Sequence, residues 1–175
     1  MQKHFVVMGV SGCGKSEVGS RLASVLTLPF IEGDQFHSPA NVALMAAGTA
    51  LTDPDRAAWL AALQGELHRA TAGGNGVVLA CSSLKRRYRD ILRAAVPGLY
   101  FIHLSGAPAL IATRLHARRN HFMPPALLDS QLRDLEPLQS GEDGIVLSIE
   151  QSPQQLVDVV LALTREGTAQ ASFGV

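Results

Sequence analysis

The chain has 175 residues, enough for one domain with a sizeable core and too few for two ordinary domains joined by a linker. Hydrophobic residues make up 47% and charged residues 17%, which excludes a disordered, collagen-like or coiled-coil chain. The formal net charge is zero and no basic stripe is interleaved with aromatic residues, so we expect no nucleic-acid partner. We predict one domain over residues 1–167 and a C-terminal tail over residues 168–175.

From the sequence we expect neither a membrane span nor a signal peptide. No apolar run approaches the roughly 18 residues that span a bilayer, and residues 1–5 lack the layout of a signal peptide. We therefore expect a cytoplasmic protein with no membrane partner. Cys13 and Cys81 fit neither a metal-binding pair nor a disulfide framework, and no two histidines show ligand spacing with a third partner.

Apolar runs and helix signals alternate along the chain. Strands are predicted at residues 4–8, 29–31, 77–80, 99–104 and 144–149. Helices are predicted after the first strand, at residues 108–119, and at three dipeptides in which a capping side chain precedes proline: Ser38-Pro39, Asp53-Pro54 and Ser152-Pro153. Glycines are expected to end these last three helices, at Gly48, Gly73-Gly74 and Gly167. The alternation predicts a parallel sheet covered by helices on both faces.

A phosphate-binding loop follows the first strand. Residues 9–16 match the pattern G-x-x-x-x-G-K-[ST] and lie between an apolar strand and an amphipathic helix. Inward-facing amides and the helix N-terminus would bind phosphate oxygens, Lys15 would reach the β- and γ-phosphates, and Ser16 would ligate Mg²⁺. We expect an ATP site formed by Gly9, Val10, Ser11, Gly12, Cys13, Gly14, Lys15, Ser16 and Glu17. The alternative is a glycine turn that binds nothing.

The class of phosphate-loop protein follows by elimination. A GTPase would carry an Asn-Lys-x-Asp segment, which is missing, and a motor or AAA-type ATPase needs a longer chain. Small-molecule and nucleotide kinases remain. We therefore predict an α/β fold of the three-layer P-loop kinase type, with a central parallel five-stranded sheet, helices on both faces and a mobile lid.

Several segments resemble the gluconate kinases (gluconokinases), over about residues 4–164. They are Met8-Gly-Val-Ser-Gly-Cys-Gly-Lys-Ser16, Gly33-Asp-Gln-Phe-His37, Asn41, Met45-Ala-Ala-Gly48, Leu51-Thr-Asp-Pro-Asp-Arg56 with Trp59, Cys81-Ser-Ser-Leu-Lys85 with Tyr88-Arg-Asp90, and His121-Phe-Met123. The resemblance implies ATP-dependent phosphorylation of D-gluconate at its 6-hydroxyl, giving 6-phospho-D-gluconate and ADP, in a homodimer. One departure is Arg119-Asn120, where the family has Lys-Gly.

Two candidate acceptor-binding residues follow the second strand. Asp34 lies at the carboxyl edge of the predicted sheet, where open α/β sheets bind their ligands. Its carboxylate could orient the acceptor hydroxyl and take its proton during transfer, or it could be a turn-forming surface residue. His37, three residues later, could bind a hydroxyl or simply begin a helix.

Two cations occupy the first turns of predicted helices. A cation there opposes the helix dipole unless an anion is present, so Arg56 could bind the carboxylate of the acceptor. Asp53 or Asp55 could supply that anion internally instead. Lys85 follows a predicted Ser82-Ser83 cap and has the same interpretation.

A basic segment precedes the expected lid. Residues 85–119 contain eight basic side chains and one acid, which indicates a local anion site. Arg114 and Arg118 are four residues apart and share a helix face. By resemblance to lid-bearing kinases, Arg114 would stack on adenine and Arg118 would cover the transferring phosphoryl group. The lid is expected at about residues 118–128, where His121 would close over the substrate or dock the loop.

These observations combine into one functional prediction with two rivals. Lys15, Asp34 and Arg118 are the predicted catalytic residues of a gluconate kinase, with ATP and Mg²⁺ as cofactors. A shikimate kinase-like enzyme is the rival within the class. A nucleotide-dependent regulatory switch is the rival outside it, and such a switch would need no acceptor carboxylate.

Overall fold

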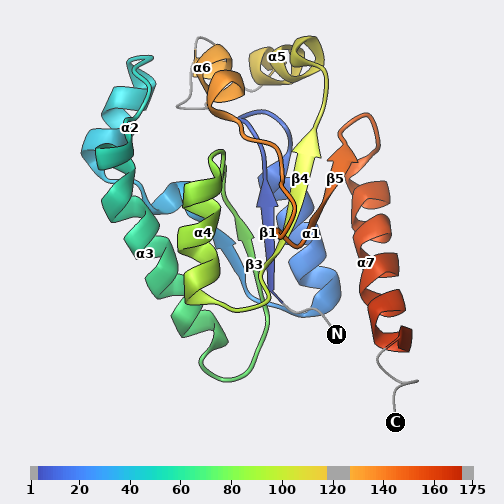
Figure 1. Ribbon diagram of the computed structural model, residues 1–175. Coiled ribbons are helices and arrows are strands. Elements are labelled where there is room, and N and C mark those ends of the chain that lie inside the picture. The colour runs from blue at the N-terminus through green and yellow to red at the C-terminus, as the bar shows by residue number, and fades with distance from the viewer. Residues whose placement is uncertain (1–3, 118–126, 171–175) are drawn as a thin grey trace.

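The computed structural model describes residues 4–117 and 127–170 of the chain. Five parallel strands form one sheet in the order β2-β3-β1-β4-β5 (Figure 1). The strands are β1 His4–Met8, β2 Phe30–Glu32, β3 Val77–Ala80, β4 Tyr100–Ser105 and β5 Gly144–Ser148. This confirms the predicted five-stranded parallel sheet. The strand that precedes the phosphate loop lies at its centre.

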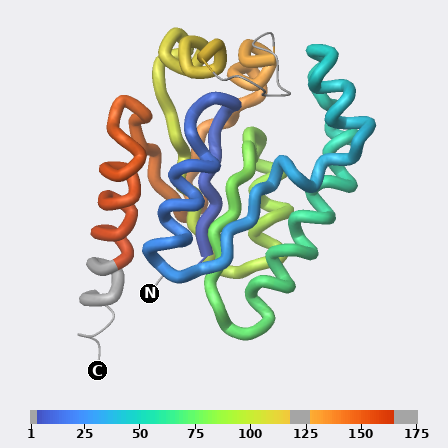
Figure 2. Tube along the Cα trace, turned by 180° about the vertical axis from the view of Figure 1, so that it is seen from behind, coloured from blue at the N-terminus to red at the C-terminus, as the bar shows by residue number. Residues whose placement is uncertain are grey.

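Helices cover both faces of the sheet and the end where the strands finish. They are α1 Lys15–Leu26, α2 Pro39–Ala46, α3 Asp53–Thr71, α4 Arg86–Ala95, α5 Pro108–Ala117, α6 Leu127–Asp134 and α7 Pro153–Gln170, with a 3₁₀ helix η1 at Gly33–Phe36. α3 and α4 cover one face, and α1 and α7 cover the other (Figures 1 and 2). α2, α5 and α6 lie beyond the carboxyl ends of the strands.

The alternation of side chains along β1 builds a core on each face of the sheet. Phe5 and Val7 pack in one cluster with residues of α1 and α7. Val6 and Met8 pack in the other with residues of α3 and α4. Both faces are apolar because each is covered by helices. No helix in the described ranges is both long enough and apolar enough to cross a membrane.

α3 begins one residue earlier than the sequence indicated. The cap is Thr52, whose hydroxyl accepts the Asp55 N–H while the Asp55 carboxylate accepts the Thr52 N–H at 2.7 Å. This reciprocal pair satisfies two free amides at once, which a cap by Asp53 alone would not do. Asp53 is therefore the first helical residue, and its carboxylate is available to other partners.

The start of α4 also differs from the prediction. Its N-cap is Lys85, without a side-chain bond, and not the Ser82-Ser83 pair. The carboxylate of Glu136 instead accepts the N–H of Arg86 at 2.6 Å. A long-range carboxylate thus satisfies a free amide and offsets the positive end of the helix dipole.

α7 continues to Gln170, past the Gly167 at which the sequence predicted its end. A glycine inside a helix costs about 1 kcal/mol relative to alanine, which weakens a helix without terminating it. Residues 168–170 are therefore helical and not part of a loose tail.

Arg89, one of the basic residues counted in residues 85–119, is an internal structural group. It is fully buried and makes a bidentate ion pair with the buried Glu142, at 2.7 Å and 2.8 Å. Its remaining N–H groups donate to the carbonyls of Ser83, Leu84, Glu136 and Pro137. Together these contacts join α4 and the loop before it to the segment after α6.

Candidate active site

The phosphate loop connects β1 to α1 at the centre of the sheet. Gly14 caps α1 with φ 97°, a left-handed conformation that favours glycine. Lys15 is the first residue of α1, and its ammonium donates to the Val10 carbonyl at 3.1 Å. The lysine therefore lies across its own loop, at the positive end of the helix dipole.

A cavity of about 300 Å³ lies on one side of the loop. Its walls come from the loop and α1, from α5, and from the start of α7: Gly12, Cys13, Gly14, Glu17, Val18, Arg114, Ala117, Gln151, Pro153 and Leu156. The guanidinium of Arg114 donates to the Ile149 carbonyl at 2.7 Å, which fixes its direction. Arg114 and the loop residues therefore share one cavity, which we call the nucleotide cavity.

A second, smaller cavity of about 20 Å³ lies on the other side of the loop. It is lined by Ser11, Lys15, Asp34, His37, Met45, Arg56, Ser82 and Gln131. Five residues singled out from the sequence, Ser11, Lys15, Asp34, His37 and Arg56, are therefore brought together from three segments of the chain. We call this the acceptor cavity.

The position of Asp34 is set by its neighbours on η1. A Cβ at position 33 would lie 2.5 Å from the Ala80 carbonyl oxygen, so glycine is needed where η1 leaves the sheet. The Trp59 indole N–H donates to the Gly33 carbonyl at 2.8 Å. These two contacts hold η1 in place beside β3, and Asp34 on η1 lines the acceptor cavity.

His37 is held against Trp59. The two rings stack with centroids 4.4 Å apart and planes at 12°. Burial, assisted by the nearby Arg56 cation, lowers the pKa of His37 to about 4 against the opposing effect of the Asp34 charge. His37 is thus neutral at physiological pH, and it can hydrogen-bond a hydroxyl but does not attract a carboxylate as a cation.

Arg56 is a buried cation whose guanidinium faces the acceptor cavity. Only 8% of it is exposed, and its Nε has no hydrogen-bond partner in the described part of the chain. It forms no ion pair with Asp53 or Asp55, the two internal anions considered from the sequence; its guanidinium lies 5.7 Å from the centroid of the Tyr88 ring. A buried guanidinium that has no carboxylate partner among the described residues can pair with an added anion.

Lys85 differs from Arg56 in having internal partners. Its ammonium lies 3.5 Å from carboxylate oxygens of both Asp53 and Asp134. Asp53 also accepts hydrogen bonds from Arg87 and the Tyr88 hydroxyl. The structure therefore places Lys85 in an ion-pair network between α3, α4 and α6, outside the residues that line the acceptor cavity.

Sequence reasoning missed Gln131, Ser82 and Met45 as cavity residues. Gln131 has the most specific contact, because its Oε1 accepts the Ser11 N–H of the phosphate loop at 2.6 Å. The signal for it was present, since Leu127, Leu128 and Gln131 follow the three-and-four spacing of a buried helix face. Ser82 and Met45 lie in the segments Cys81-Ser-Ser-Leu-Lys85 and Met45-Ala-Ala-Gly48, and their resemblance to the gluconate kinases was the signal that could have found them.

Two predicted site residues, Arg118 and His121, lie outside the described residues, as does most of the expected lid. The last two residues assigned to the lid, Leu127 and Leu128, form the buried first turn of α6. Within the described part of the chain no three His, Cys, Asp or Glu side chains cluster to hold a metal. Ser16 lies on the first turn of α1, beside Lys15, and its hydroxyl oxygen is a donor type that Mg²⁺ prefers.

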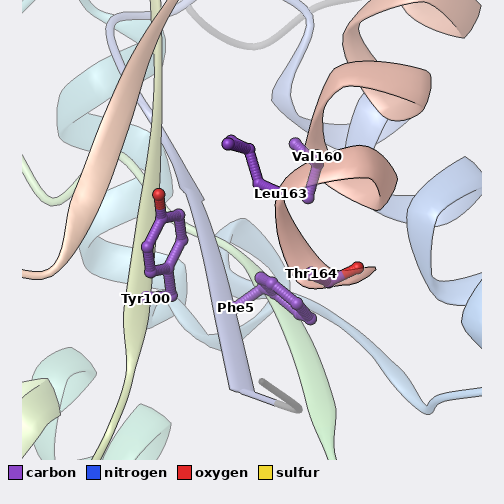
Figure 3. Close-up of a pocket in the computed structure, with 5 residues that line it drawn as sticks. All are labelled: Phe5, Tyr100, Val160, Leu163 and Thr164. Atoms are coloured by element: carbon purple, nitrogen blue, oxygen red, sulfur yellow. The ribbon is translucent and has the colours of Figure 1, made fainter. Parts of the chain in front are cut away.

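An apolar cavity of about 170 Å³ lies elsewhere, between the sheet and α7 (Figure 3). It is lined by Phe5, Tyr100, Val160, Leu163 and Thr164. Phe5 and Tyr100 lie near the beginnings of their strands, at the opposite end of the sheet from the phosphate loop. Ligands of open α/β sheets bind at the carboxyl ends of the strands, so this cavity is not the candidate site.

Solved structures with the same fold include two close relatives. A sugar kinase from a Janibacter species superposes with a TM-score of 0.88 at 44% identity, covering 93% of this chain and 94% of that one. A gluconokinase from Sinorhizobium meliloti superposes with a TM-score of 0.86 at 41% identity, covering 98% and 97%.

The family model described as Shikimate kinase matches residues 11–162. Together with the sheet order and the phosphate loop, this match defines the molecule as a P-loop kinase. The gluconokinase of Gluconobacter oxydans is 46% identical over 159 residues, covering 91% of this chain and 87% of that protein. The chain belongs to the gluconokinase family.

Proposed function

We propose that this kinase transfers the γ-phosphoryl group of ATP to the 6-hydroxyl of D-gluconate, giving 6-phospho-D-gluconate and ADP. The observation that carries the proposal is the buried Arg56, whose guanidinium has no carboxylate partner among the described residues and lines one cavity with Asp34 and Lys15. An acceptor that carries both a carboxylate and a hydroxyl offers a partner to Arg56 and another to Asp34. Gluconate has this chemistry.

In the proposed mechanism Asp34 acts on the acceptor hydroxyl. Its carboxylate accepts the hydrogen bond of the 6-hydroxyl, orients the oxygen toward phosphorus and takes the proton as the new O–P bond forms. The neutral His37 beside it hydrogen-bonds a hydroxyl of the sugar chain. Arg56 pairs with the carboxylate of gluconate and fixes which end of the acceptor faces the phosphate loop.

Lys15 and Arg118 stabilise the charge that develops on the transferring group. When ATP binds, the Lys15 ammonium gives up its hydrogen bond to the Val10 carbonyl and donates to phosphate oxygens instead. Its positive charge then stabilises the negative charge that develops on the oxygen of the leaving ADP. Arg118, four residues after Arg114 in the sequence, supplies a second cation to the phosphoryl group. When bound, Mg²⁺ neutralises phosphate charge, and the Ser16 hydroxyl is the residue that would hold it.

The nucleotide cavity provides a place for the adenine base between α5 and α7. Arg114 is fixed by the Ile149 carbonyl and shares that cavity with Pro153. A planar base between a guanidinium and a proline ring gains stacking on both faces.

The homodimer and the cytoplasmic location stay predictions from the sequence.

A coupled ADP-release assay tests the proposal. The purified protein with Mg-ATP is offered D-gluconate, D-gluconolactone, glucose and shikimate at equal concentrations. We expect ADP release that depends on gluconate and is weak with the lactone, which lacks the free carboxylate. Shikimate is the informative rival, since the matching family model carries that name. Equal rates with glucose or shikimate, or ADP release indifferent to any acceptor, would contradict the assignment.

A further inference from the structure

Gln131 joins the helix beside the acceptor cavity to the phosphate loop. Its side-chain Oε1 accepts the N–H of Ser11, the third residue of the loop, at 2.6 Å. The two residues are 120 positions apart in the chain, and both are buried, at 8% and 6% exposed. The N–H of a phosphate-binding loop is thus held by a side chain from α6, and both residues line the acceptor cavity.

The packing of α6 directs this amide. Leu127 packs in a small cluster with Met45 and Leu51, and Met45 also lines the acceptor cavity. Leu128 packs in the main core with residues of α1 and α5. Gln131 follows them by one turn on the same face of α6, and its side chain lines the acceptor cavity together with Ser11 and Met45.

The contact has a consequence for the geometry of transfer. Ser11 and Lys15 approach the acceptor cavity from the loop, and Asp34 approaches it from η1. In-line transfer requires the acceptor oxygen and the γ-phosphorus to be held within a few tenths of an ångström of the reactive arrangement. The hydrogen bond from the Ser11 N–H to Gln131 on α6 therefore helps to set the position of the phosphate loop relative to the acceptor cavity.

We propose that Gln131 is a positioning residue for phosphoryl transfer, which holds the start of the phosphate loop at the acceptor cavity through the Ser11 N–H. This inference rests on the proposed function, because gluconate-dependent turnover is its readout. The residue acts through Ser11 and the loop. Its loss should therefore lower kcat while leaving the binding of ATP and gluconate nearly unchanged.

The first test replaces Gln131 by methionine, an apolar side chain of similar length. We expect Gln131→Met to lower kcat with gluconate at least tenfold. KM for gluconate and the Kd of the non-hydrolysable analogue AMP-PNP should stay within about threefold of wild type. The matched control is Gln64→Met, because Gln64 is a half-buried glutamine that donates to the Ile91 carbonyl between α3 and α4, away from both cavities.

Three outcomes of this test overturn the proposal. A kcat within twofold of wild type would show that the contact does not position the loop. A loss matched by Gln64→Met would show a general packing defect. Tighter AMP-PNP binding with unchanged kcat would show that Gln131 merely occupies the Ser11 N–H until phosphate displaces it. If the wild-type protein itself lacks gluconate-dependent turnover, the proposed function fails instead, and the two failures are distinguishable.

A second variant keeps the proposal testable if the methionine variant does not fold. Gln131→Glu retains an oxygen that can accept the Ser11 N–H, and it adds a negative charge beside the transferring phosphoryl group. Burial and the phosphates both raise the pKa of such a carboxyl toward neutrality. The ratio of its kcat to that of wild type should therefore rise several-fold between pH 8 and pH 6. A ratio independent of pH would contradict a position beside the reacting group.

Discussion

Asp34 is the residue on which the chemistry of the proposed reaction depends most directly. Replacing it with asparagine keeps its shape and removes the carboxylate that accepts the hydroxyl proton. We expect Asp34→Asn to lower kcat by about 10² or more, the usual range for a positioned acid or base, with little effect on ATP affinity. Steady-state kinetics in both substrates measure this. A change confined to KM for gluconate would show that Asp34 only binds the acceptor.

Arg56 should behave in the opposite way. Its charge is proposed to bind a group remote from the reacting hydroxyl, in the ground state and the transition state alike. We expect Arg56→Gln to raise KM for gluconate at least tenfold and to leave KM for ATP within about threefold. A charge-assisted bidentate hydrogen bond is worth about 1.5–3 kcal/mol, which corresponds to that range.

The control for Arg56 is a nearby cation that the structure places outside the acceptor cavity. Arg87 is exposed on α4 and pairs with Asp53. Arg87→Gln should leave KM for gluconate within about twofold of wild type, because surface ion pairs contribute little. An equal rise in KM for gluconate in Arg56→Gln and Arg87→Gln would show that the acceptor carboxylate is attracted by the overall positive charge of this region and not bound by Arg56.

At the scale of elements, the capping box of α3 holds the helix that carries Arg56 and Trp59. Thr52→Ala removes the hydroxyl that accepts the Asp55 N–H, together with its hydrogen bond to the Asp55 carboxylate. We expect a loss of about 0.5–2 kcal/mol in the free energy of unfolding, measured by urea denaturation. Asp53→Ala, at the residue that the sequence suggested as the cap, is not a matched control, because Asp53 also binds Lys85, Arg87 and Tyr88. An unchanged free energy of unfolding in Thr52→Ala would contradict the observed cap.

The Arg89–Glu142 pair joins α4 to the segment that follows α6. Glu142→Gln would leave the fully buried Arg89 without its countercharge. Breaking one partner of a buried pair typically costs about 3–5 kcal/mol, a large share of the stability of a domain this size. We expect the free energy of unfolding, measured by urea denaturation, to fall by that amount. Glu136→Gln, at a more exposed carboxylate that caps α4, should cost much less.

For the whole molecule, local patterns predicted the elements and long-range contacts decided the site. The strands, their parallel pairing and the phosphate loop follow from apolar periodicity and from one contiguous motif. The carboxylate partners of Lys85 and Arg89 lie more than thirty positions away in the chain. No local pattern shows that these two cations have carboxylate partners whereas Arg56 has none among the described residues.

The position of Arg89 around its helix would have indicated that this residue is buried. Tyr88, Arg89, Leu92 and Ala95 follow the buried face of α4, so Arg89 falls on an apolar stripe where an unpaired charge is costly. That position predicts a buried partner without naming it. Gln131 occupies the same kind of position on α6, and its partner, a backbone N–H, carries no sequence signal at all.

The stability of the folded protein should depend on pH through His37. In the unfolded chain this histidine takes up a proton near the ordinary histidine pKa of 6.5, whereas burial lowers the pKa in the folded state to about 4. Between these values the unfolded state binds more protons than the folded state. The contribution of His37 is therefore fully present above pH 6.5 and is lost as the pH falls toward 4.

We expect the free energy of unfolding to fall between about pH 6.5 and pH 5, and to fall less steeply in His37→Gln. Urea denaturation at half-unit steps of pH over this window measures both slopes, above the range in which Asp53 and Asp55 take up protons. His68→Gln, at an exposed position on α3, is the control and should retain the wild-type slope. Parallel pH curves of the free energy of unfolding for wild type and His37→Gln would mean that water in the cavity solvates a protonated His37. The histidine could then not serve as a neutral hydrogen-bonding group for the acceptor.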